Sequence, residues 1–328
     1  MNSKIGFRVM RTGVFAAANL TAKALATAVA ATATCAFADL GDWQVPGSWE
    51  VRVSEQGAVK EWTGKTWCGH IQGMCATSNA LYFAFHNQIV KTDWYGRLLK
   101  RAENLVKHQG DICWWNGHLY TIVCHVKPVP GFGGAAGSIQ MFDEDLNLVK
   151  ERTFLRPKGA GGDGIACLDG VLYIGLSTVA LPGEEDKPRH CARYRKFDAT
   201  TLEDIGDTFI VDHHSPLYST GQQNITTDGT YLYVASDVPD EGGCNFFKFD
   251  KDFNVLGKWS FGWFQGVDVV PGGKDGATRF VYCSTPNWMK QSEKPGLSVH
   301  ALVLFADIKG DKVTDITRHC VFKNPMPR

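Results

Sequence analysis

The chain repeats one short pattern five times, and this repetition restricts its fold more than any other feature. Each copy has an aliphatic residue followed by tyrosine, at Leu81-Tyr82, Leu119-Tyr120, Leu172-Tyr173, Leu232-Tyr233 and Val281-Tyr282. In the first four copies a turn-forming pair comes just before, at Ser78-Asn79, Asn116-Gly117, Asp169-Gly170 and Asp228-Gly229. Such pairs accept the positive φ of a two-residue turn, so each copy is predicted to begin with a β-hairpin.

A second hairpin is predicted in every copy, because an apolar segment ending in Asp follows the first hairpin. These segments are Ile89 to Asp93, Met141 to Asp143, Lys196 to Asp198, Lys248 to Asp250 and Leu304 to Asp307. Four strands per copy, with no helical periodicity between copies, predict an all-β chain folded as a five-bladed β-propeller. Six blades is the alternative count. A two-sheet sandwich would not explain the regular return of one unit.

The segment before the first full copy resembles one more outer hairpin, at Val51 to Val53 and Ala58 to Trp62. We expect this hairpin, about residues 49–62, to close the ring by adding a strand to the last blade, so that no bare sheet edge remains. Residues 39–328 are therefore predicted to form a single β-propeller domain.

The first 38 residues have the pattern of a signal peptide. They contain Lys4, Arg8, Arg11 and Lys23 but no acidic residue, then an Ala-rich apolar run that ends at Ala36-Phe37-Ala38. We predict cleavage after Ala38 and a periplasmic or secreted protein. The run is too short to predict a membrane span. The remaining chain has a small excess of acidic over basic residues, which argues against a nucleic-acid-binding protein.

Nine cysteines remain after the predicted cleavage, an odd number, and none forms a C-x-x-C motif. Cys191 and Cys244 stand just before the third strands of adjacent predicted blades. A disulfide between them, two unpaired thiols, and thiolate ligation of a metal beside His190 are the alternatives.

Antiparallel order brings two sets of loops to one face of the ring: those joining the second and third strands of a blade, and those entering the next blade. The second set of loops and the channel mouth hold most of the candidate site residues. His70 and His108 occupy equivalent places in adjacent blades and are the predicted catalytic residues, as general acid and base. With Asp163 they could also hold a divalent metal ion. The predicted ligand-binding residues are Gln72, Gln109, Asp163, Gln223, Gln265, His125 and, as a stacking surface, Trp263.

These residues favour an exported propeller that binds a small-molecule or carbohydrate-like ligand, or a glycan, at the channel mouth. A His-dependent or metal-assisted lyase or hydrolase is one hypothesis. The other is a non-catalytic propeller that binds a ligand or a protein partner, because a fold alone does not determine function. Signatures of other enzyme classes, such as G-x-S-x-G and H-E-x-x-H, are missing from the sequence.

The blade spacing, together with the Gln72-Gly73 pair at the start of the first inner strand, resembles that of the glutamine cyclotransferases. This resemblance implies a secreted five-bladed propeller with its site at the channel mouth, and it makes glutaminyl cyclotransferase chemistry a third hypothesis. That family carries a glutamate where Gln72 aligns. An amide does not shuttle a proton as a carboxylate does.

Overall fold

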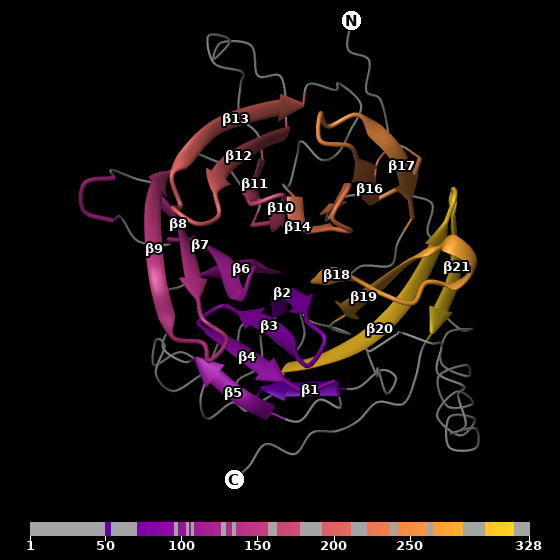
Figure 1. Ribbon diagram of the computed structural model, residues 1–328, viewed down its shortest axis with the longest axis horizontal. Coiled ribbons are helices and arrows are strands. Elements are labelled where there is room, and N and C mark those ends of the chain that lie inside the picture. The colour runs from indigo at the N-terminus through magenta and orange to yellow at the C-terminus, as the bar shows by residue number, and fades with distance from the viewer. Residues whose placement is uncertain are drawn as a thin grey trace, which may run out of the picture. The chain divides into compact units, whose positions relative to one another are not determined.

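The computed structural model arranges the chain as five antiparallel sheets around a common axis, a five-bladed β-propeller (Figure 1). It describes residues 50–53, 71–94, 98–102, 105, 108–125, 129–132, 136–156, 163–177, 192–210, 222–236, 240, 242–260, 265–284 and 299–317. All of these belong to one unit, residues 37–328. The described residues contain no helix with the length and apolarity needed to cross a membrane.

The first four blades have their strands in chain order from the axis outward, as the repeat predicted. The first blade is β2 (Ile71–Ala76), β3 (Leu81–Phe85), β4 (Gln88–Thr92) and β5 (Leu98–Ala102). The second is β6 (Gln109–Trp115), β7 (His118–Cys124), β8 (Ala136–Phe142) and β9 (Leu148–Leu155). The third is β10 (Ile165–Leu168), β11 (Val171–Ser177), β12 (Ala192–Asp198) and β13 (Asp204–Ile210).

The fourth blade follows the same order, and the fifth follows it except for an extra outer strand from the N-terminal part of the chain. The fourth blade is β14 (Gln222–Thr227), β15 (Leu232–Ser236), β16 (Phe246–Phe249) and β17 (Val255–Trp259). The fifth contains β18 (Val267–Val270), β19 (Thr278–Ser284) and the long β20 (Val299–Lys309), with a short 3-10 turn at Lys274–Gly276. Both β21 (Lys312–Thr317) and β1 (Glu50–Val53) pair with β20.

Two of the four predicted two-residue turns, those of the second and third blades, have the expected backbone. In the first and fourth blades four residues join the two strands, 77–80 and 228–231. Asn116 and Gly117 have φ of 46° and 82°, and Asp169 and Gly170 have φ of 53° and 78°. Positive φ at both central residues gives a hairpin turn whose twist matches that of the flanking strands.

The core consists of five apolar clusters, each formed where two adjacent blades face one another. One cluster joins the first blade to the second through Tyr82 and Phe142, and another joins the fifth blade to the first through Phe305 and Phe83. The other three clusters join the remaining pairs of neighbours. Phe142, with its repeat equivalents Phe197 and Phe249, is buried, as the sequence predicted for packing between blades.

The turn between the third and fourth strands supplies a second repeated core position. Asp143, Asp198 and Asp250 accept hydrogen bonds from backbone N–H groups of the turn that follows each of them. Each turn places an apolar residue at positive φ, and its side chain is buried: Leu146, Leu202 and Phe253. Each of these side chains packs in the cluster shared with the preceding blade.

Glycine at the start of the inner strands lets neighbouring blades approach one another closely. A Cβ atom on Gly73 would lie 2.5 Å from the Cα of Asp111, and one on Gly110 would lie 2.6 Å from the Cβ of Asp163. No side chain fits at either position without moving a strand. The inner strands also contact one another in sequence, and β18 contacts β2, which closes the ring.

Candidate functional site

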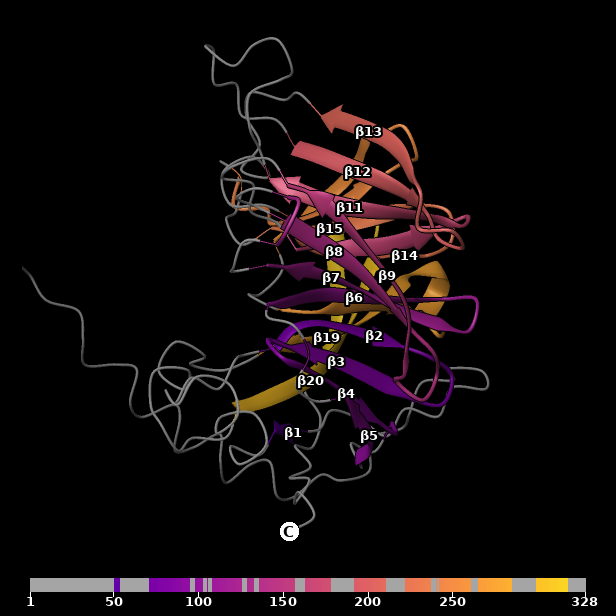
Figure 2. The ribbon, with the colours of Figure 1, turned by 90° about the vertical axis from the view of Figure 1, so that its left-hand side faces the viewer.

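The inner strands begin, and the second strands end, on the same face of the ring, and strands cross between the two faces (Figure 2). Backbone hydrogen bonds fix the residues there. His108 stands directly before β6 and exchanges two such bonds with Cys124, of 2.9 and 2.8 Å. The carbonyl of Asp163, just before β10, accepts a hydrogen bond of 2.9 Å from the N–H of Asp111. The backbone of adjacent blades therefore places the side chains described next.

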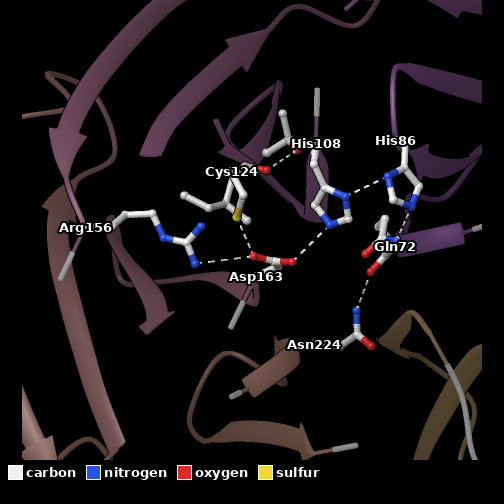
Figure 3. Close-up of polar contacts among 9 residues, drawn as sticks. Gln72, His86, His108, Cys124, Arg156, Asp163 and Asn224 are labelled. Carbon is white, nitrogen blue, oxygen red and sulfur yellow. Dashed lines mark hydrogen bonds and ion pairs between the residues drawn. The ribbon is translucent and has the colours of Figure 1, made fainter. Parts of the chain in front are cut away.

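Four side chains from three blades form a continuous polar chain at this mouth (Figure 3). It runs from Gln72 through His86 and His108 to Asp163. The Gln72 Nε2 atom lies 2.9 Å from His86 Nε2, and the two Nδ1 atoms of the histidines are 2.6 Å apart. His108 Nε2 lies 3.2 Å from Asp163 Oδ2. Gln72 and His86 are buried, whereas the His108 side chain is 21% exposed, so the chain reaches solvent at His108.

Asp163 is a largely buried carboxylate, with 13% of its side chain exposed, and donors surround it. Its Oδ1 accepts a hydrogen bond of 2.5 Å from the Cys124 thiol and lies 3.6 Å from a guanidinium nitrogen of Arg156. Burial acts to raise the pKa of Asp163, but the hydrogen bond and charge of His108, with Arg156 and Cys124, outweigh it and lower that pKa to about 2. Asp163 is therefore ionised at neutral pH. Burial, with the nearby Asp163 charge, raises the pKa of the Cys124 thiol, so this cysteine stays protonated.

A second carboxyl group, Asp111, lies fully buried below the mouth. Its Oδ2 accepts backbone hydrogen bonds from Ile225 (2.9 Å) and Ile165 (3.3 Å). Its Oδ1 accepts one of 3.0 Å from Asn224, whose amide also donates to the carbonyl of Gln72. Burial raises the pKa of Asp111 well above its usual value, although these donors oppose the shift. One carboxyl group thus links the inner strands of the second, third and fourth blades.

Asp268, on the inner strand of the fifth blade, makes the corresponding links on the other side of the ring. It accepts hydrogen bonds from the Thr226 hydroxyl (2.5 Å) in the fourth blade and the backbone N–H of Ala76 (2.8 Å) in the first. Burial raises the pKa of Asp268 to about 6. Asp111 and Asp268 thus connect the inner strands through hydrogen bonds.

Several predicted ligand-binding residues have other positions. The Gln109 side chain is fully buried and donates to Gln140 on the third strand of its own blade. His125 bonds Ser138 at 2.7 Å, toward the outer strands, and burial lowers its pKa. Neither side chain joins the polar chain at the mouth.

The remaining predicted residues fall into two groups. Gln223 lies half-buried in β14, and Gln265 lies buried just before β18, where its carbonyl accepts a hydrogen bond from the Cys283 thiol. Other parts of the sequence prediction lie outside the described residues: His70, Trp263, Cys191, residues 1–38 and the second half of the predicted closing hairpin. Cys244 is a free thiol.

The predicted metal set of His70, His108 and Asp163 is not complete within the described residues. Among those residues, no group of three His, Cys, Asp or Glu side chains is arranged to hold a metal ion. Both ring nitrogens of His108 face protein groups, Asp163 and His86. The described geometry is that of a hydrogen-bonded chain of side chains.

A cleft of about 240 Å³ lies elsewhere, between the fourth and fifth blades on the opposite face. Tyr233, Lys248, Trp259 and Thr278 line part of it. The Lys248 ammonium lies 3.8 Å from the centre of the Tyr231 ring, a cation–π contact. The cleft shares no residue with the polar chain, so it is separate from the candidate site.

The predicted site residues did not include three members of the candidate site: His86, Arg156 and Cys124. Arg156 follows the outer strand of the second blade, where the chain enters the third blade on the mouth face. Because Arg156 and Asp163 lie in the same segment between two blades, the sequence could have predicted that this basic residue pairs with Asp163. Cys124 ends a strand otherwise composed of core residues, and its sequence context gave no sign of its contact with Asp163.

Comparison with known proteins adds no family. No family model matches the chain, and no curated protein matches it. Solved structures do match, at low identity. A Dos1 propeller is 12% identical with a TM-score of 0.38, over 77% of this chain and 59% of its own length. The match therefore spans less than two thirds of that protein.

Two further structures match over more of their own length. A protein of unknown function from Bacteroides caccae is 11% identical with a TM-score of 0.42, over 77% of this chain and 82% of its own. Myxococcus xanthus glutaminyl cyclase is 9% identical with a TM-score of 0.44, over 79% and 95%. At these identities the matches concern the fold alone, and the sheet topology establishes a five-bladed propeller.

Proposed function

We propose that this chain is an exported propeller that binds a small polar molecule at the mouth of its channel and transfers a proton to or from it. The proposal rests on the polar chain that runs from Gln72 to Asp163, whose three contacts are 2.9, 2.6 and 3.2 Å long. The residues come from three blades and meet where the inner strands begin. Export is proposed from the signal-peptide pattern of residues 1–38.

The pairing of His108 with Asp163 supports proton transfer. An ionised carboxylate that accepts a hydrogen bond from one imidazole nitrogen orients the ring and stabilises it when it becomes charged. Asp163 has a pKa lowered to about 2 and meets this requirement. His108 is also the histidine of the chain that reaches solvent, with 21% of its side chain exposed. A lyase or hydrolase step that needs a general base or acid fits this arrangement.

A second candidate function is ligand binding without turnover. It is favoured by the contact between His86 and His108, because that contact engages the ring nitrogen that does not face Asp163. For His108 to accept a proton from a ligand, this nitrogen has to leave His86. In a binding protein the same contact would stay intact.

A screen of glycans, lactones and small acids against the purified protein tests both candidates. Binding is read as a thermal shift, and product formation by mass spectrometry. Proton transfer predicts that His108→Ala lowers turnover at least about 100-fold, since general acid–base catalysis contributes about that much. The matched control is His118→Ala, because His118 bonds the carbonyl of Asn116 in a hairpin turn on the opposite face.

Each result separates the candidates. Turnover that is lost in His108→Ala but kept in His118→Ala supports proton transfer. Ligands that bind without product support the binding protein. Turnover that survives in His108→Ala overturns the assigned role of this histidine, and a screen without any bound ligand overturns both candidates.

A further inference from the structure

The polar chain at the mouth has a direction, and this direction follows from Asp163. An ionised carboxylate only accepts hydrogen bonds, so His108 must carry its hydrogen on Nε2, which faces Asp163 at 3.2 Å. In a neutral imidazole the other nitrogen is then an acceptor. His108 Nδ1 therefore accepts a hydrogen bond, and the donor is His86 Nδ1 at 2.6 Å.

The same reasoning continues to the other end of the chain. A neutral His86 with its hydrogen on Nδ1 has an acceptor at Nε2. That nitrogen therefore needs a donor, and the group opposite it is the amide nitrogen of Gln72 at 2.9 Å. The ionised Asp163 at one end of the polar chain therefore requires a hydrogen-bond donor at position 72. The amide nitrogen of Gln72 can be that donor. With both histidines neutral, Gln72 oriented as a donor completes one hydrogen pattern along the four side chains.

We infer that Gln72 is a positioning residue, which acts through His86 to hold His108 in the Nε2–H tautomer that pairs with Asp163. This inference rests on the proposed proton transfer for its functional meaning, because it assigns Nδ1 as the proton-accepting nitrogen of His108. The hydrogen pattern itself is independent of any ligand.

The surroundings hold Gln72 in place for this role. Gln72 is buried in the inner strand of the first blade, and its carbonyl accepts a hydrogen bond of 2.9 Å from Asn224 in the fourth blade. The His86 ring meets the His108 ring edge-on, with 4.1 Å between centroids and 79° between planes. The two rings are therefore in direct contact, and their Nδ1 atoms lie 2.6 Å apart.

Replacing the donor by an acceptor should invert the pattern. In Gln72→Glu the carboxylate accepts a hydrogen bond from His86 Nε2, so the hydrogen of His86 moves from Nδ1 to Nε2. No bond to carbon changes, and one hydrogen changes its nitrogen through exchange with solvent. His86 Nδ1 then becomes an acceptor, so His108 donates from Nδ1 as well as from Nε2, and it takes up one further proton from solvent to do so.

The experiment is nitrogen NMR of the ligand-free full chain with ¹⁵N-labelled histidine, assigned with single histidine variants. We expect wild type at neutral pH to carry hydrogen on His86 Nδ1 and His108 Nε2. Gln72→Glu is expected to carry it on His86 Nε2. The matched control is Gln223→Glu, which adds the same charge to an inner strand at the same face and should keep the wild-type pattern.

The outcomes are decisive without a substrate. Wild type with its hydrogen on His86 Nε2, or Gln72→Glu with an unchanged His86, overturns the inference. The wild-type arm does not use Gln72→Glu, so failure of that variant to fold leaves this arm of the test intact. If the expected tautomers are found but the protein shows no turnover of any substrate, the inference stands and the proposed proton transfer is overturned. If turnover depends on His108 but the tautomers differ from those expected, the proposed function stands and the role of Gln72 is overturned.

Discussion

The substitution Asp111→Ala tests whether one buried carboxyl group holds the inner strands together. It removes the acceptor of the backbone N–H groups of Ile165 and Ile225 and of the Asn224 amide. Each buried donor left without a partner costs about 1–3 kcal/mol. Removing Asp111 also removes the cost of burying a carboxyl group, which is the cause of its raised pKa. The lower part of the range therefore applies, and we expect a loss of about 3 to 4 kcal/mol in the free energy of unfolding.

The assay is urea unfolding followed by tryptophan fluorescence, with the midpoint and slope compared between variants. The control is Asp252→Ala, because Asp252 is an exposed turn residue, and its loss should change the unfolding free energy by no more than about 0.5 kcal/mol. A loss below about 1 kcal/mol for Asp111→Ala, at an unchanged slope, would refute the idea that this carboxyl group joins three blades.

Two further predictions concern the same inner strands. Asp268 has a folded-state pKa of about 6 against an ordinary value near 4, so the folded state binds its proton more tightly. The free energy of unfolding of wild type relative to Asp268→Asn should therefore be highest below about pH 4. It should fall by about 3 kcal/mol as the pH rises to 7, because each pKa unit corresponds to about 1.36 kcal/mol. A pH-independent difference between the two proteins in urea unfolding would contradict this. Gly73→Ala should destabilise by about 3 kcal/mol, because its Cβ would lie 2.4 Å from an Asp111 oxygen. Gly117→Ala, in an open turn, should cost only about 1 kcal/mol for its positive φ, and equal losses in thermal unfolding would refute the steric argument.

The repeating strands of the fold could be predicted from the sequence because each blade repeats the same local sequence pattern. Alternating apolar positions, such as those around Tyr82 and Tyr120, and turn pairs such as Asn116-Gly117 give direct local signals. The buried leucine or phenylalanine at positive φ in each Asp turn could not be predicted, because neither residue has a local preference for that backbone. Leu202 adopts it because its side chain completes the cluster between two blades.

The site was predictable only in its location. The sequence placed His108, Gln72 and Asp163 at one face because the loop order of antiparallel blades decides this. The direction of a side chain within a strand pair depends on register, which the sequence did not fix. Gln109 therefore lies inside its blade, bonded to Gln140, while its neighbour His108 joins the polar chain.

The long strand β20 has a consequence for how the protein reaches its folded state. It pairs with β21 over its last residues and with β1 over its first, where Val53 lies opposite Val299, about 250 positions later in the chain. Contacts between residues so far apart in sequence are slow to form, since most of the chain must first be brought into a closed loop. During synthesis β1 therefore cannot pair until β20 of the fifth blade has been made. The first four blades can pair locally before then, and we expect closure of the fifth blade to be the late, slow step of folding.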